Sequence, residues 1–169
     1  YSGGDFDLPD YIARGNNITY SVNKLFRRTI WEENRYQKML FEDIALIPAL
    51  VTRYPRIGYI PKPFYNYYRR AGTLSTTLSG EMTDILKAFR LFLDTSDRRY
   101  RDEAVYCTAK QLYWNMTQSR VLFQADFIGL LKEYEPDFRL NPYIAGDKKI
   151  KKLLDYLDRD VIPEVFLCV

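Results

Sequence analysis

The chain contains no histidine and only two cysteines among its 169 residues. Without histidine, a His-based catalytic triad, an HExxH zinc site and a histidine proton shuttle are excluded. Cys107 and Cys168 stand far apart and follow no metal-ligand spacing, so we interpret them as small apolar residues of a protein from a reducing compartment. The net charge of +3 is too small to indicate nucleic-acid binding by itself.

Several targeting and ligand-binding patterns are also missing from the sequence. No apolar run is long enough to span a bilayer, and no signal peptide is visible. The sequence has no Gly-rich phosphate loop, no internal repeat and no low-complexity tract. It opens at YSGGDFD without an initiator methionine, so we expect a fragment of a longer protein or a processed form.

The residues that are present indicate a globular chain. Hydrophobic residues make up 47% and charged residues 28% of the sequence, which is typical of a folded protein. Aromatic residues reach 16%, with 15 tyrosines. This content predicts a packed core with rings left over for a binding surface.

The first half of the chain predicts mixed secondary structure. Residues 1–17 read as a loop, and the apolar alternation over 18–22 predicts a short strand. The stretch 56–70 (RIGYIPKPFYNYYRR) is β-like, with prolines that mark an edge or a bend. Between them, apolar residues on one face predict a helix that begins at Asp43, and we expect Pro48 to bend this helix rather than break it.

The second half changes to helical spacing, with apolar residues three or four positions apart. The segments with this spacing are 81–95, 97–117, 126–134 and 147–157. We therefore predict an α+β chain in two parts, with mixed structure over 1–78 and mostly helical structure over 79–169.

Two neighbouring acids, Glu42 and Asp43, lie within the apolar stretch KMLFEDIALIPALV. Charge in such a stretch is costly unless it is paired or used. One interpretation is that Asp43 caps the helix that follows. The other is a general base with a tuned pKa, with its neighbour positioning a hydroxyl group. Consecutive side chains on a helix diverge, so a facing pair of glycosidase carboxylates is excluded.

Three motifs in order, NKLFRR, FEDIALIPAL and PFYNYYRRAGTLS, resemble the acceptor-side half of inverting, nucleotide-sugar-dependent glycosyltransferases of the GT-A fold. More narrowly, they resemble the large bacterial family that builds capsules and other cell-envelope polysaccharides. The resemblance covers about residues 20–77. It implies that 1–78 is the acceptor-side part of a GT-A catalytic domain and that 79–169 is a helical C-terminal extension.

The resemblance also implies an activity with two catalytic acids. The complete enzyme would transfer a sugar from a nucleotide-sugar donor to a hydroxyl group of a saccharide or lipid-linked acceptor, in polysaccharide biosynthesis. Asp43 would deprotonate the acceptor hydroxyl, and Glu42 would orient that hydroxyl or the base. The implied location is the cytoplasm, or the inner face of the membrane where a lipid-linked acceptor would lie.

The third motif would supply the substrate contacts. Donor-diphosphate contacts are implied for two guanidinium groups and two hydroxyl groups, those of Arg69, Arg70, Thr73 and Ser75. The two arginines could equally form a solvated strand end. Tyr65 and Tyr67 could stack on acceptor sugars, although such rings are more often part of a core.

The donor side of the implied enzyme is missing from the sequence. The family binds Mg or Mn through a DxD motif that ends an apolar strand. Here Asp5 to Asp7 (DFD) match the letters, but no apolar strand precedes them, so we interpret them as a loop. We expect a divalent metal in the complete enzyme, no metal bound by this chain alone, and no activity of the isolated chain.

Three other interpretations remain open. The basic segment 147–157 could lie on an anionic membrane or form the charged outer face of a core-packed helix. The whole chain could be a non-enzymatic helical interaction module, with Asp43 as a cap and the tyrosines as a partner surface. Nucleic-acid binding ranks last, because only YYRR and DRRYR support it. The sequence does not indicate an oligomeric state.

Overall fold

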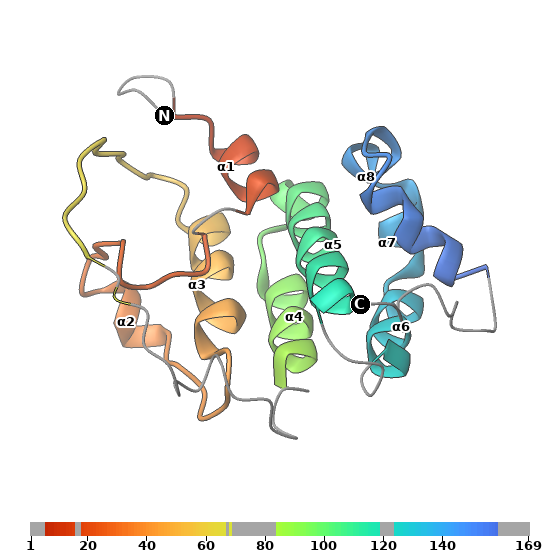
Figure 1. Ribbon diagram of the computed structural model, residues 1–169. Helices are drawn as coiled ribbons and strands as arrows, with labels where there is room; N and C mark the ends of the chain where they lie inside the picture. The colour runs from red at the N-terminus through yellow and green to blue at the C-terminus, as the bar shows by residue number, and fades with distance from the viewer. Residues whose placement is uncertain (1–5, 16–17, 67, 69–83, 119–123, 159–169) are drawn as a thin grey trace.

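The computed structural model describes residues 6–15, 18–66, 68, 84–118 and 124–158. These residues form helices joined by loops (Figure 1). The α-helices are α1 (Leu8–Arg14), α2 (Ile30–Glu33), α3 (Glu42–Arg53), α4 (Asp84–Thr95), α5 (Arg101–Gln118), α6 (Gln124–Glu133), α7 (Glu135–Leu140) and α8 (Pro142–Gly146). Two 3₁₀ helices, η3 (Arg98–Tyr100) and η5 (Ile150–Tyr156), complete the set.

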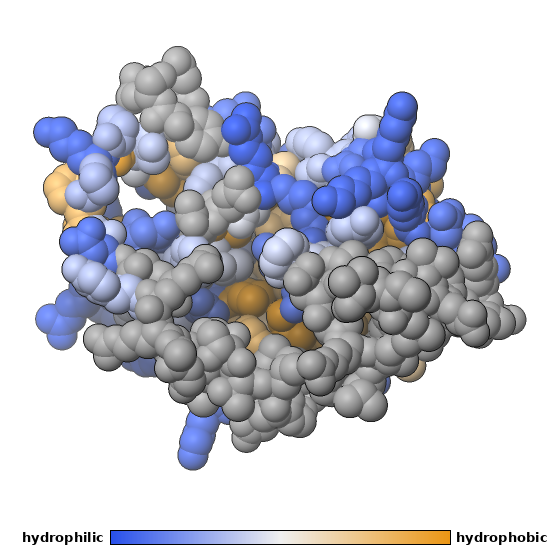
Figure 2. Space-filling model, in the orientation of Figure 1, coloured by the Kyte–Doolittle hydropathy of each residue, from blue (hydrophilic) through white to orange (hydrophobic). Residues whose placement is uncertain are grey.

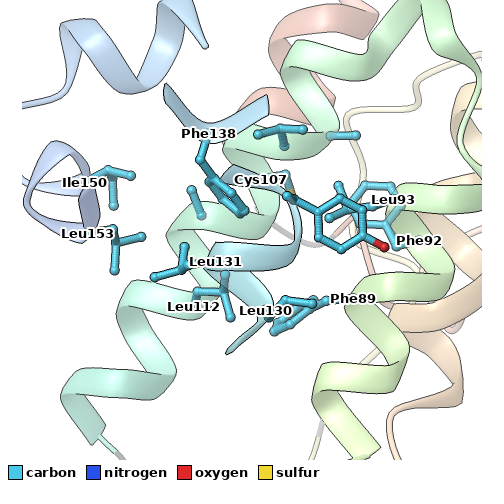
Figure 3. Close-up of a cluster of buried hydrophobic side chains, with 14 of the residues drawn as sticks. Phe89, Phe92, Leu93, Cys107, Leu112, Leu130, Leu131, Phe138, Ile150 and Leu153 are labelled. Carbon is cyan, nitrogen blue, oxygen red and sulfur yellow. The ribbon is translucent and has the colours of Figure 1, made fainter. Parts of the chain in front are cut away.

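Helix α5 lies at the centre of the fold. It contacts α1, α4, α7, α8 and η5, and α4 in turn packs against α3 (Figure 1). The core between these helices consists of apolar side chains spaced at helical intervals, which is why one face of each helix is buried. Figure 3 shows its centre, where Phe89, Phe92 and Leu93 of α4 meet residues of the later helices: Cys107, Leu112, Leu130, Leu131, Phe138, Ile150 and Leu153.

The first helix is closed at both ends by local sequence. The Asp7 carboxylate accepts the N–H of Asp10 at 3.0 Å, so Asp7 is the N-cap of α1. Gly15 ends the helix with a φ of +66°, a conformation that glycine adopts without strain. Its Cα faces Cys107 so closely that an added Cβ would lie 2.8 Å from the sulfur atom. The free thiol of Cys107 is buried, as the sequence predicted.

Helix α3 carries the two acids and is continuous through Pro48. Pro48 is the seventh residue of α3, so it lies inside the helix and removes the one N–H bond to Ile44 O in the first turn, and the helix continues past it. The helix begins at Glu42, one residue before the predicted start, after Phe41 adopts a φ of +60°. Seven of its residues are buried, so α3 is a core element and not a surface appendage.

The α+β prediction is wrong. The described ranges contain helices and loops and no strand, so this chain is not an α/β GT-A domain. Over 18–22 the chain forms a turn, with Ile18 buried while Tyr20 and Val22 are exposed. Over 55–66 the chain forms no strand, and its N–H groups bond locally, as Ile57 does to Pro55 and Lys62 does to Ile60. Prolines remove further ladder donors, so this segment has no strand partner in the described chain.

The helical second half is confirmed for the described residues: α4, α5, α6 and η5 lie close to the four predicted segments, whereas α7 and α8 were not predicted. The division into parts at residue 78 stays a prediction, because residues 69–83 lie outside the described ranges. The helices on either side of it, α3 and α4, share one core. None of the helices in the described ranges combines the length and apolarity needed to cross a bilayer.

Candidate functional site

The two acids stand in the first turn of α3 but face different surroundings. Glu42 is exposed, whereas Asp43 is partly buried. Oδ1 of Asp43 accepts the N–H of the adjacent Ile44 at 2.8 Å. The prediction that Asp43 is the N-cap is wrong, because the N-cap position is Phe41 and Asp43 lies inside the helix. Its carboxylate nevertheless accepts an N–H group in the first turn of the helix, as the capping interpretation expected.

The surroundings of Asp43 make its charged form less favourable than in water. Burial raises the pKa of the Asp43 carboxyl above its usual 3.8, and the nearby Glu42 charge raises it further. The Ile44 N–H and the Lys24 ammonium oppose this rise in pKa and keep the charged form accessible. A carboxylate with a raised pKa is a stronger base than a free one.

Lys24 is the cationic neighbour of Asp43, and it comes from the first motif, NKLFRR. Its Nζ donates to the backbone oxygen of Tyr20 at 2.6 Å and to Oδ1 of Asn23 at 2.8 Å. Burial lowers the pKa of Lys24 to about 8, and attraction to Asp43 partly offsets that fall. The fold therefore brings the first and second motifs together. The sequence analysis assigned Lys24 no role, although the motif that contains it was a signal.

Contacts from the α4 region hold both ends of α3. Ahead of the helix, the Leu40 N–H donates to Oδ2 of Asp84, the first residue of α4, at 3.0 Å. At the other end, Oγ1 of the buried Thr52 donates to Ala49 O at 2.8 Å and accepts the N–H of Asp97 at 3.0 Å. The position of Asp43 thus depends on residues that follow it by about a quarter to a third of the chain.

Most of the predicted substrate residues lie outside the described residues: Tyr67, Arg69, Arg70, Thr73 and Ser75. Tyr65 is 53% exposed, so it is not a core residue, and its role toward an acceptor stays a prediction. Of the DFD acids, Asp5 lies outside the described residues and Asp7 caps α1.

The predicted basic helix 147–157 is largely a 3₁₀ helix, η5, and its apolar side faces the core. Ile150, Leu153 and Tyr156 are buried. The lysines of this region are exposed: Lys148, Lys149, Lys151 and Lys152. In Figure 2 hydrophilic side chains cover the surface over α8 and η5, at the upper right. The outer face of η5 is therefore polar, and its apolar residues contribute to the core.

Comparison with known proteins gives one relationship. No protein-family model and no solved structure matches this chain. The chain is similar to the cholesterol galactosyltransferase of Borreliella burgdorferi, with 26% identity over 93 residues. The matched region is 54% of this chain and 25% of that protein, so it spans about a quarter of the relative's length. The similarity supports a relationship to a glycosyltransferase.

Proposed function

We propose that this chain is the acceptor-side part of a longer glycosyltransferase, which transfers a sugar from a nucleotide-sugar donor to an acceptor hydroxyl group with inversion. The observation that carries the proposal is that partly buried Asp43, at the start of α3, lies near enough to Lys24 for their charges to interact, because this links two of the motifs. The similarity to a galactosyltransferase supports the same class of reaction. The helical fold observed here replaces the GT-A fold in this proposal.

In the proposed reaction, Asp43 takes the proton of the acceptor hydroxyl as the oxygen attacks the anomeric carbon. A new carbon–oxygen bond forms, and the bond from the anomeric carbon to the nucleoside diphosphate breaks with its electron pair on the diphosphate. The raised pKa of Asp43 strengthens it as a base. Exposed Glu42 orients the hydroxyl, and the Lys24 ammonium stabilises negative charge at the site.

Apart from contacts to the donor diphosphate, the binding sites for the donor and for any metal are proposed to lie elsewhere in the longer protein. Among the described residues, no three His, Cys, Asp or Glu side chains come together to hold a metal ion, so we derive no step through a metal. We assign the donor-diphosphate contacts to Arg69, Arg70, Thr73 and Ser75, and acceptor contacts to Tyr65 and Tyr67. The isolated chain is expected to be inactive.

The acceptor is proposed to be a saccharide or lipid-linked molecule of the cell envelope. The similar protein of Borreliella burgdorferi is named for transfer of a galactosyl group to a lipid, cholesterol, which favours a lipid-linked acceptor here. The exposed lysines around η5 would hold the enzyme at an anionic membrane by charge alone, because the apolar side of η5 is buried. We therefore place the protein at the inner face of the membrane.

The test is the Asp43→Asn variant of the complete enzyme. We expect kcat to fall by about 10²–10⁴-fold, the usual contribution of a general base, with donor binding nearly unchanged. Asp126→Asn is the matched control, because Asp126 is an exposed acid in the first turn of α6. Unchanged turnover in Asp43→Asn would refute the assignment of the base.

The second candidate is a non-enzymatic interaction module. It is favoured by the exposed apolar side chains that follow α3, namely those of Tyr59, Ile60, Phe64, Tyr65 and Tyr68. In that case the complete protein would transfer no sugar, and Asp43→Asn would bind its partner as the unmodified protein does. The same pair of variants therefore separates the two functions.

A further inference from the structure

A depression opens at α2, which supplies Trp31 and Glu32 to its lining. It is lined by Arg28, Trp31, Glu32, Arg35 and Tyr36, and its volume is about 310 Å³. This volume falls at the lower end of the range of roughly 300–1,000 Å³ for small-molecule sites. The lining combines two rings, two guanidinium groups and one carboxylate.

The rings of the depression are held by aromatic contacts. Phe26 packs edge-on against Trp31, with centroids 5.3 Å apart and planes at 79°. Tyr36 lies on Trp31 with centroids 5.4 Å apart and an angle of 34°. These contacts favour the orientations that the two lining rings adopt. Tyr36 is 42% exposed, which leaves its ring accessible to a ligand.

The backbone beneath the depression is tied to α3. Asn34, which is 6% exposed, donates from Nδ2 to Ile30 O at 2.6 Å and accepts a 2.8 Å bond from Arg53 at Oδ1. Arg35 donates from Nη1 to the backbone oxygen of Asn34 at 2.8 Å. The turn that presents Arg35 and Tyr36 is therefore formed before any ligand arrives, which reduces the entropy cost of binding.

We propose that this depression binds a saccharide unit of the acceptor, beyond the hydroxyl group that reacts; the proposal rests on the glycosyltransferase function above. The C–H face of a sugar ring would stack on Trp31 and Tyr36. Its hydroxyl groups would accept from Arg28 and Arg35 and donate to Glu32. A purely apolar ligand would leave these three charged groups unused, and a simple anion has neither a hydroxyl donor for Glu32 nor a face for the two rings, so a neutral sugar uses the whole lining best.

The first test uses the fluorescence of Trp31, because the chain has two tryptophans. Trp114, on α5, is 62% exposed, and Trp114→Phe leaves Trp31 as the single indole. We expect saturable quenching or a blue shift of this variant with members of a panel of neutral hexose and hexosamine disaccharides. The matched control is Trp31→Phe, which keeps Trp114 and should show no change. The inference is overturned if no sugar in the panel gives a saturable fluorescence change in Trp114→Phe. It is also overturned if Trp114→Phe and Trp31→Phe show the same change.

The second test separates binding from chemistry in the complete enzyme. Tyr36→Ala, at an exposed ring, and Trp31→Ala should each raise the acceptor KM by about tenfold, equivalent to about 1.4 kcal/mol of lost stacking, with kcat nearly unchanged. Trp114→Ala should change neither. If KM is unchanged in both variants while Asp43→Asn abolishes transfer, the subsite is refuted and the proposed function stands. If Asp43→Asn has no effect but the sugars still bind at Trp31, the assigned base fails and the subsite stands.

Discussion

Two buried threonines should respond with opposite signs to the same substitution, threonine to valine. Both Thr52 and Thr108 are fully buried, and valine has nearly their shape. Thr52 joins α3 to the turn after α4, through its bonds to Ala49 O and from the Asp97 N–H. In Thr108, on α5, Oγ1 is buried and has no hydrogen-bond partner in the described part of the chain.

The expected magnitudes follow from these contacts. Thr52→Val leaves the partly buried Asp97 N–H without its acceptor, which costs about 1–2 kcal/mol. Thr108→Val removes a buried hydroxyl that gains no bond, and should stabilise the fold by about 1 kcal/mol. For a domain of this size each kcal/mol shifts Tm by roughly 2–4 °C. We therefore expect Tm to fall by about 2–8 °C in the first variant and to rise by about 2–4 °C in the second.

Urea denaturation followed by far-UV circular dichroism measures both variants, with the m-value as the check that the unfolding transition is unchanged. The reasoning is refuted if the two variants shift stability in the same direction. It is also refuted if Thr52→Val changes the free energy of unfolding by less than about 0.5 kcal/mol, the usual range for a surface substitution. Because Thr52 holds the end of α3, this experiment also tests the contact that helps to position Asp43.

Three further predictions concern the site, the end of α1 and the lysine surface. The pKa of Asp43 is raised above 3.8 in the folded state, so the folded protein loses stability as the pH rises from about 3.8 through the folded-state pKa. Asp43→Asn should therefore have a higher Tm than the unmodified protein at neutral pH. The difference in Tm should vanish below about pH 3.8. Gly15→Ala should lower the free energy of unfolding by about 1–3 kcal/mol, measured by thermal unfolding, because of its φ of +66° and the close contact with Cys107. Gly129→Ala is the control: Gly129 lies on α6 with open space around it, so this variant should stabilise the fold by about 0.5–1 kcal/mol. Replacing the four lysines of 148–152 by glutamine should weaken binding to phosphatidylserine vesicles, measured by sedimentation, by about two to three orders of magnitude, at about 1 kcal/mol per lysine. The control is an equal charge change at four other exposed residues, Lys38, Arg56, Lys62 and Lys87, which should have a much smaller effect. Equal losses of binding in the two variants would refute the role of the lysine surface.

The sequence by itself predicted the longer helices, but it missed α7 and α8 and read the stretch that forms α1 as a loop. Apolar residues three or four positions apart indicated α3, α4, α5 and α6 and which face of each is buried, because a helix repeats every 3.6 residues whatever its neighbours are. It also singled out Asp43 as an acid in an apolar stretch, and predicted a buried Cys107. These are properties that neighbouring residues in the chain determine.

Only the tertiary structure decided which segments meet. The segment 55–66 has the local pattern of a strand but forms none. A strand also needs a partner strand, and the sequence of the segment itself does not encode that partner. The contacts of Leu40 with Asp84 and of Thr52 with Asp97 join positions far apart in the sequence. Lys24 reaches the vicinity of Asp43 because the turns between them fold back, and its lowered pKa follows from burial that no linear pattern predicts.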